Sequence, residues 1–285
     1  MGRVENEGRK SLLMEKGSSC NIQTMENQTR GISGSTLKLV ALVAMLIDHI
    51  GAVVLWRMIL TLSYGGTILG GAWQPEIGNL LDVYNAMRLI GRIAFPIYCF
   101  LLVEGFQRTH SKWKYVLRLG IFALVSEVPF DLALSGSIMD VSYQNVFFTL
   151  LLGLCAMICS DKVTEWCVCI PDRVWSRVAG YLLSGVATAV MALTAYVLHT
   201  DYQAVGVVCI MVLYLFRSNK WGQAMAGAIS FLWESTAPLA FIIILCYNGK
   251  RGMKLKYIFY LFYPLHLLIL YGICVWMGIG GCSVK

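Results

Sequence analysis

Long apolar segments separated by short polar connections constrain this chain more than any other feature. The first of them, residues 36–57, contains the run LKLVALVAMLIDHIGAVVLW. A helix needs about 20 mostly apolar residues to cross the roughly 30 Å hydrocarbon core of a bilayer. This segment is therefore predicted to be a membrane-spanning helix.

Further segments of the same kind follow along the chain. They lie at 84–106, 115–134, 143–160, 174–198, 202–216 and 257–279. The stretch 221–248 is too long for one span and has Glu234 in its middle, so we interpret it as two short helices that meet there. The sequence thus predicts an all-α fold, a polytopic integral membrane helical bundle with about nine transmembrane helices (eight to ten).

The charged residues are few and unevenly placed. They make up 14% of the chain, against about 25% in an ordinary soluble domain, and residues 1–38 hold 10 of the 39. So few charges cannot cover a water-soluble surface, which excludes a cytosolic enzyme, a disordered protein and a coiled coil. We expect a disordered cytoplasmic tail at 1–35, a transmembrane domain at 36–279 and a short tail at 280–285.

The distribution of lysine and arginine predicts the orientation. These residues gather in the N-terminal tail and in alternate connections, whereas 58–83, 135–142, 199–201 and the region around Glu234 contain neither. Because Lys and Arg remain on the cytoplasmic side, the N-terminus is expected in the cytoplasm. The net charge of +7 then reflects membrane orientation, and we expect no nucleic-acid partner.

Two other features of the sequence carry little chemistry. Most of the ten cysteines lie inside predicted spans, where they behave as small apolar residues, and no zinc-type spacing is present, so no metal is expected. The Gly-rich segment 60–80 is long enough to form an outer lid or a re-entrant piece.

Ionisable and amide side chains inside the predicted spans are the informative residues. Such groups are costly in a bilayer and usually functional. On the predicted topology, several of them lie at one depth in the outer half of the membrane, on four consecutive helices. The set comprises His49, Arg88, Arg92, Glu127, Asp131 and Asn145; Asp48 precedes His49 on the first helix, and His266 lies on the last helix. The alternative is that single pairs, such as Arg88 with a carboxylate, only tie helices together.

Lys38 and His49 share one face of the first helix. Their separation of eleven residues is about 20° more than three full turns, and about 16 Å along the axis. A cation at the rim and an imidazole deeper in the same groove would suit a long ligand with an anionic head and a reactive end, such as coenzyme A. Taken alone, Lys38 also fits a snorkelling residue at a helix end.

The chain resembles the TraX family, membrane proteins named for the F-pilin acetylation protein. The motifs are LKLVALVAMLIDHIGAV at 37–53, RLIGRIAFPIYCFLLVEGF at 88–106 and SEVPFDLALSG at 126–136. They continue with QNVFFTLLLGL at 144–154, YNGKRG at 247–252 and FYPLHLLILY at 262–271.

TraX itself is similar to the acyltransferase-3 group, in which a basic residue and a histidine on the first helix mark the active groove. Lys38 and His49 match that pattern. Arg88 and Arg92 are candidates for the arginine pair expected near the acyl donor, although their spacing is Arg-x-x-x-Arg rather than Arg-x-x-Arg.

This resemblance implies an acetyltransferase of the bacterial cytoplasmic (inner) membrane that takes acetyl from cytoplasmic acetyl-CoA. His49 is the expected general base. Either Glu127 or Asp131 would orient it, because Asp48 lies about 100° round the helix. Arg88 or Arg92 with Asn145 would stabilise the oxyanion or hold the acceptor. The acceptor is expected to be a peptide N-terminus, a small amine or a sugar.

Two other classes of function remain open on the sequence. A proton-coupled transporter would use the same Asp, Glu and His residues as a relay, although no pseudo-symmetric halves are visible. An assembly subunit of a secretion apparatus would need no chemistry of its own.

Overall fold

The computed structural model describes residues 31–167, 173–253 and 256–280. In this part the chain is helical, and its only β-type pairings are isolated bridges such as that between Ile32 and Tyr247. The tails predicted at the two ends lie mostly outside the described residues.

All nine predicted spans are helical. The helices are α2 (Gly34–His49), η1 (Ile50–Leu55), α3 (Trp56–Ser63), α4 (Ile77–Gly91), α5 (Ala94–Arg108), α6 (Lys112–Ser135), α7 (Val146–Cys167), α8 (Arg173–Val197), α9 (Gln203–Leu215), α10 (Lys220–Ser230), α11 (Ala240–Leu245) and α12 (Lys256–Trp276), with short 3₁₀ turns η2 (Leu69–Gly71) and η3 (Ala237–Leu239). The predicted break near Glu234 is confirmed, because this residue lies in the turn between α10 and η3.

Among the residues that the structure describes, five helices are long and apolar enough to cross a membrane. They are Gly34–Ser63, Ile77–Arg108, Val146–Cys167, Val174–Val197 and Phe259–Trp276. The helices α9, α10 and α11 are shorter; even α9, with 13 residues, extends only about 20 Å. The protein is therefore a polytopic helical membrane protein in which short helices complete the bundle.

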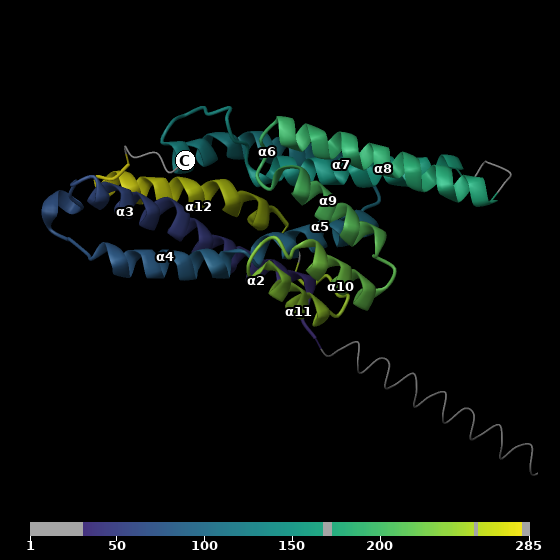
Figure 1. Ribbon diagram of the computed structural model, residues 1–285, viewed down its shortest axis with the longest axis horizontal. Coiled ribbons are helices and arrows are strands. Elements are labelled where there is room, and N and C mark those ends of the chain that lie inside the picture. The colour runs from purple at the N-terminus through teal and green to yellow at the C-terminus, as the bar shows by residue number, and fades with distance from the viewer. Residues whose placement is uncertain (1–30, 168–172, 254–255, 281–285) are drawn as a thin grey trace, which may run out of the picture.

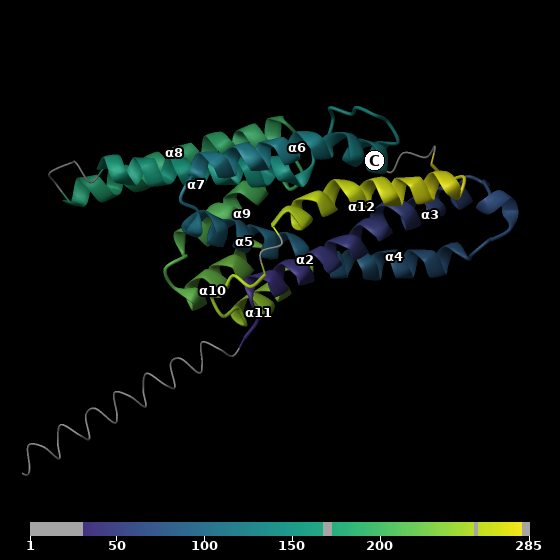
Figure 2. The ribbon, with the colours of Figure 1, turned by 180° about the vertical axis from the view of Figure 1, so that it is seen from behind.

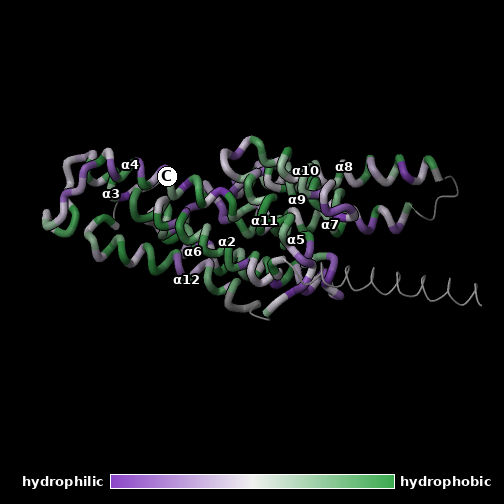
Figure 3. Tube along the Cα trace, turned by 90° about the horizontal axis from the view of Figure 1, so that it is seen from below, coloured by the Kyte–Doolittle hydropathy of each residue, from purple (hydrophilic) through white to green (hydrophobic). Residues whose placement is uncertain are grey.

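The long helices form two groups that meet near the centre of the molecule. At one end, α2–η1–α3, α4 and α12 lie alongside one another, and at the other end α7 and α8 form a long pair with α9 beside them (Figures 1 and 2). Only residues 92–93 separate α4 from α5. The two helices therefore follow one another closely and connect the group that contains α4 with the group that contains α7 and α8. Hydrophobic residues predominate along the helices, and hydrophilic ones gather mostly near their ends (Figure 3).

The outward face of α8 shows why such a chain needs a bilayer. Leu182, Val186, Val190 and Leu193 are all more than half exposed, and they recur every three or four residues. An apolar stripe of this kind is costly in water but suits contact with lipid.

The Gly-rich segment between α3 and α4 packs against the end of α12. Ile68 is fully buried, and the backbone N–H of Leu69 donates a hydrogen bond to the carbonyl of Met277. Gly70 and Gly71 have positive φ values of 63° and 91°, which glycine adopts without strain. The segment thus folds over the helix ends as a connecting loop.

Candidate functional site

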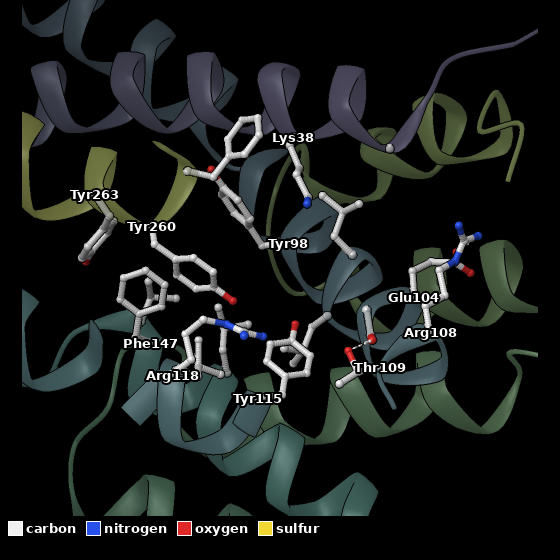
Figure 4. A pocket seen from close by; sticks show the side chains of 18 of the residues that line it. Lys38, Tyr98, Glu104, Arg108, Thr109, Tyr115, Arg118, Phe147, Tyr260 and Tyr263 are labelled. Carbon is white, nitrogen blue, oxygen red and sulfur yellow. Dashed lines mark hydrogen bonds and ion pairs between the residues drawn. The ribbon is translucent and has the colours of Figure 1, made fainter. Parts of the chain in front are cut away.

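A cavity of about 260 Å³ lies between five helices (Figure 4). The beginning of α2, the second half of α5, the beginning of α6, the beginning of α7 and the first turns of α12 form its walls. Residues near Tyr247 and Arg251, in the loop between α11 and α12, complete it. Its volume is below the usual range for drug-sized ligands, so it fits a narrow molecule or one arm of a larger one.

Positive charge predominates in the lining of this cavity. Among the described lining residues, four are cationic, namely Lys38, Arg108, Arg118 and Arg251, and one, Glu104, carries a carboxylate. Glu104 accepts a hydrogen bond from Arg108 at 2.7 Å and another from the Tyr247 hydroxyl at 3.2 Å. The cavity is therefore suited to an anionic ligand.

The inner end of the cavity is aromatic and lies beside His49. Met45 lines it one helical turn before His49, and Phe147 and Tyr263 meet there edge to face, with ring centroids 4.9 Å apart. The Tyr263 ring is in turn 5.9 Å from the imidazole of His49. Met45 and Tyr263 thus form the wall between the cavity and the histidine.

His49 forms a hydrogen-bonded pair with His266 of α12. Nδ1 of His49 is 2.6 Å from Nε2 of His266, and Nδ1 of His266 is 2.7 Å from the carbonyl oxygen of Phe262. Since a carbonyl only accepts, Nδ1 of His266 must carry a hydrogen, which leaves Nε2 of the neutral ring as an acceptor. His49 then donates from Nδ1, and its own Nε2 carries a lone pair.

The helix changes geometry directly after His49. Residues Ile50–Leu55 form a π-helical stretch between α2 and α3, and π-turns inside α-helices occur frequently at functional sites. On the other side of the pair, Pro264 lies inside α12 two residues before His266, where it cannot donate a backbone hydrogen bond. His49 therefore lies at a change of helical geometry, and His266 lies one turn or less from a proline inside its helix.

The predicted residues Asp48, Arg88 and Arg92 come together, but in ion pairs outside the cavity lining. Arg88 contacts Asp48 at 2.5 Å, and Arg92 contacts Glu234 at 2.8 Å. A Cβ atom at Gly91 would collide with the Asp48 side chain, so this glycine is what lets α2 approach the junction of α4 and α5.

The predicted residues Glu127, Asp131 and Asn145 hold the beginning of α7 and the preceding loop against α6. Asn145 donates to the Glu127 carboxylate and, at 2.8 Å, to the Ala123 carbonyl. Asp131 accepts a hydrogen bond from the backbone N–H of Asp140 at 2.8 Å.

A further carboxylate, that of the half-buried Asp201, follows α8. Asp201 accepts a hydrogen bond from the Tyr143 hydroxyl at 2.6 Å, and burial raises its pKa from 3.8 to about 6. The hydrogen bond lowers this pKa, but burial has the larger effect.

The comparison with protein families is decisive for identity. The family model described as TraX protein matches residues 33–274. The chain belongs to the TraX family. It is also 26% identical over 256 residues to the probable fimbrial assembly protein FimC, serogroup H1, of Dichelobacter nodosus, which covers 84% of this chain and 94% of that protein. No solved structure matches the chain.

The TraX match includes all the helices that form the cavity and the histidine pair. Within it, Lys38 lines the cavity, whereas His49 is not one of the lining residues and lies behind Tyr263, whose ring centroid is 5.9 Å from that of the imidazole.

Sequence reasoning missed two features of this TraX site. It noted His266 as an ionisable residue but did not place it against His49, and the motif FYPLH, which carries His266, was the available signal. It also overlooked Arg118, a cation inside the predicted span 115–134.

Proposed function

We propose that this TraX family member is an integral-membrane acetyltransferase that transfers acetyl from acetyl-CoA to an amine or hydroxyl acceptor. The observation that carries this proposal is a cationic cavity whose inner wall, formed by Met45 and Tyr263, adjoins His49, a histidine that pairs with His266 through Nδ1 and keeps Nε2 for a second partner. A donor with anionic phosphates, a narrow arm and a terminal thioester has the corresponding shape.

The lone pair on Nε2 of His49 supplies the base. It accepts the proton of the acceptor N–H or O–H as that atom attacks the thioester carbonyl. The new bond joins the acceptor to the acetyl carbon, the carbon–sulfur bond breaks, and the leaving thiolate of CoA takes the proton held on Nε2 of His49, which returns to its neutral state. His266 is a positioning residue, since its hydrogen bond fixes the tautomer and the orientation of the His49 ring.

The ion pairs favour a supporting function for Arg88 and Arg92. Each guanidinium already contacts a carboxylate, so it is less available to the donor phosphates than the cavity cations are. We therefore assign these residues to holding the junction of α4 and α5 against α2 and the α10–α11 turn.

The distribution of Lys and Arg suggests the side from which the donor enters, and the TraX family relationship suggests the acceptor. The rim of the cavity lies at the Lys38 end of the long α2–α3 helix, which is the cytoplasmic end if Lys and Arg remain inside. Acetyl-CoA would then enter from the cytoplasm of a bacterial inner membrane. Because a relative is named for fimbrial assembly, a pilin-like peptide amine is the first acceptor to test, followed by small amines and sugars.

The proposal is tested with the purified full-length protein in detergent. Acetyl-CoA binding and slow release of free thiol are compared in the wild type, His49→Ala and Lys38→Ala. We expect His49→Ala to bind the donor and to lose at least about 100-fold of its turnover, as for loss of a general base. Lys38→Ala should weaken binding.

His199→Asn is the matched control. This histidine is exposed after α8 and has a positive φ of 51°, a conformation that asparagine tolerates well, so binding and turnover should be unchanged. Failure of the wild type to bind acetyl-CoA or CoA would overturn the acetyltransferase proposal and leave a proton-coupled transporter as the better account.

A further inference from the structure

Arg118 is the unexplained charge of the cavity. It enters from α6, and its guanidinium lies near two aromatic rings, 5.2 Å from the Tyr115 centroid and 5.8 Å from the Tyr260 centroid. Its Nε atom is buried and has no hydrogen-bond partner in the described part of the chain. Within residues 31–167, 173–253 and 256–280, no carboxylate lies at ion-pair distance from it.

Such a charge is costly without a counter-ion. The guanidinium carries a positive charge, and it lies within a helix of a membrane protein, where charged groups are normally paired. The contrast with Arg108 is direct, because that residue lines the same cavity but has the Glu104 carboxylate at 2.7 Å. The missing partner of Arg118 is therefore expected to be an anion that enters the cavity.

The position of Lys38 shows where that anion would lie. Lys38 comes from α2 and Arg118 from α6, and the two side chains reach into the cavity from opposite walls (Figure 4). The space further in is lined by Tyr98, Phe147 and Tyr263. An anionic group between the two cations would direct an uncharged arm toward the aromatic end and His49.

We infer that Arg118 and Lys38 form an organic-phosphate subsite, in which Arg118 binds the phosphate that adjoins the pantetheine arm of the acyl donor. This inference rests on the proposed function. Arginine suits the site because its planar fork binds two phosphate oxygens at once. The recognised chemistry is a phosphopantetheine thioester, which a free CoA thioester and an acylated carrier protein both supply.

The experiment compares donors with and without the phosphate. Binding of acetyl-CoA, S-acetyl-phosphopantetheine and S-acetylpantetheine is measured on the full chain in detergent, for the wild type, Arg118→Gln and Arg118→Lys. In the wild type, the two phosphate-bearing thioesters should bind about 10- to 100-fold more tightly than S-acetylpantetheine, as expected for charge-assisted hydrogen bonds. Arg118→Gln should abolish most of this difference and leave S-acetylpantetheine binding unchanged. Arg118→Lys should restore part of it.

Lys114→Gln is the matched control, because Lys114 is exposed one turn earlier on α6 and does not line the cavity. It should keep the wild-type preference for phosphate. If Arg118→Gln keeps the full wild-type preference for phosphate-bearing thioesters, the assignment of Arg118 to a phosphate subsite is wrong. The proposal that the cavity binds the donor would be unaffected. Absence of binding by any thioester to the wild type would overturn the proposed function together with the subsite.

Competition binding on the same purified proteins distinguishes the two sources of the donor, free acetyl-CoA and an acetylated carrier protein. An acetylated carrier protein that competes with S-acetyl-phosphopantetheine and loses affinity in Arg118→Gln supports the subsite with a carrier-bound donor. If acetyl-CoA competes and the carrier protein does not, and acetyl-CoA loses affinity in Arg118→Gln, the result supports the phosphate subsite with free acetyl-CoA as the donor.

Discussion

The protein contains two polar regions within its helical bundle, and they differ in how their charges are balanced. At the junction of α4 and α5, Arg88 and Arg92 each contact a carboxylate, at 2.5 and 2.8 Å. In the described lining of the cavity, there are four cationic residues and one carboxylate, that of Glu104. Charges balanced within the chain are expected to support the fold, whereas an excess of one sign inside a cavity is expected to bind a ligand.

The largest expected effect on stability comes from the balanced region. Arg88→Ala leaves the Asp48 carboxylate, whose side chain is 16% exposed, without its contact at 2.5 Å. The thermal midpoint in detergent should fall by an amount equivalent to about 3 kcal/mol, because loss of one partner strands a largely buried charge. The double variant Arg88→Ala with Asp48→Ala should recover part of this loss. Arg118→Gln, in the cavity, should cause no comparable loss; equal losses in the two regions would contradict the comparison.

The second expected effect is on turnover and concerns His266. His266→Ala removes the acceptor that fixes His49 Nδ1 as the donor, so we expect kcat to fall about 100-fold, or roughly 2.7 kcal/mol, with little change in KM. His266→Gln offers an amide oxygen to His49 Nδ1 and should restore much of the activity.

The spectroscopic check on His266 separates positioning from a merely structural effect. Nitrogen NMR of ¹⁵N-histidine-labelled protein should show His49 protonated at Nδ1 in the wild type and a mixture of tautomers in His266→Ala. An unchanged His49 tautomer in that variant would refute the positioning assignment.

Hydropathy predicted the helices because it depends on local composition, whereas the histidine pair depends on how distant helices pack. The spacing of Lys38 and His49 predicts a common face because both residues lie on one helix, α2. The contact of His49 with His266 joins residues 217 positions apart, and no pattern within either helix fixes the rotation of α12 against α2.

Arg118 was missed for a related reason. In a sequence, a lone arginine near a helix end resembles a snorkelling residue, and only the packing of α2, α6 and α12 encloses it in a cavity. Conversely, Arg88 and Arg92 drew attention as a pair, but the carboxylates that balance them come from two distant segments.

The third prediction concerns the close packing of α2 against the α4–α5 junction, in the region whose charges are balanced. Gly91→Ala places a methyl group against the Asp48 side chain, which should push α2 away from the α4–α5 junction. We expect a loss of about 1–3 kcal/mol, typical of overpacking, despite the better helix propensity of alanine. Gly120→Ala is a suitable control, since its nearest contact would be a side-chain atom of Leu151 at 3.8 Å. If both substitutions leave the thermal midpoint unchanged, Gly91 is not required for the close approach.

The last expected effect is the pH dependence conferred by Asp201, which leaves the protein unchanged at any fixed pH and appears only when the pH is varied. Burial raises its pKa from 3.8 to about 6 in the folded protein, so the folded state binds this proton more tightly than the unfolded state does. The resulting stabilisation is fully present below about pH 4 and is lost as the pH rises through 6. Within that window the free energy of unfolding should fall by up to about 1.4 kcal/mol per pH unit.

Asp201→Asn keeps an oxygen that accepts the Tyr143 hydrogen bond but cannot ionise. Its thermal midpoint in detergent should therefore change less than that of the wild type between pH 4 and 6. An identical pH profile in the two proteins would show that Asp201 is not a buried carboxylate that carries a raised pKa.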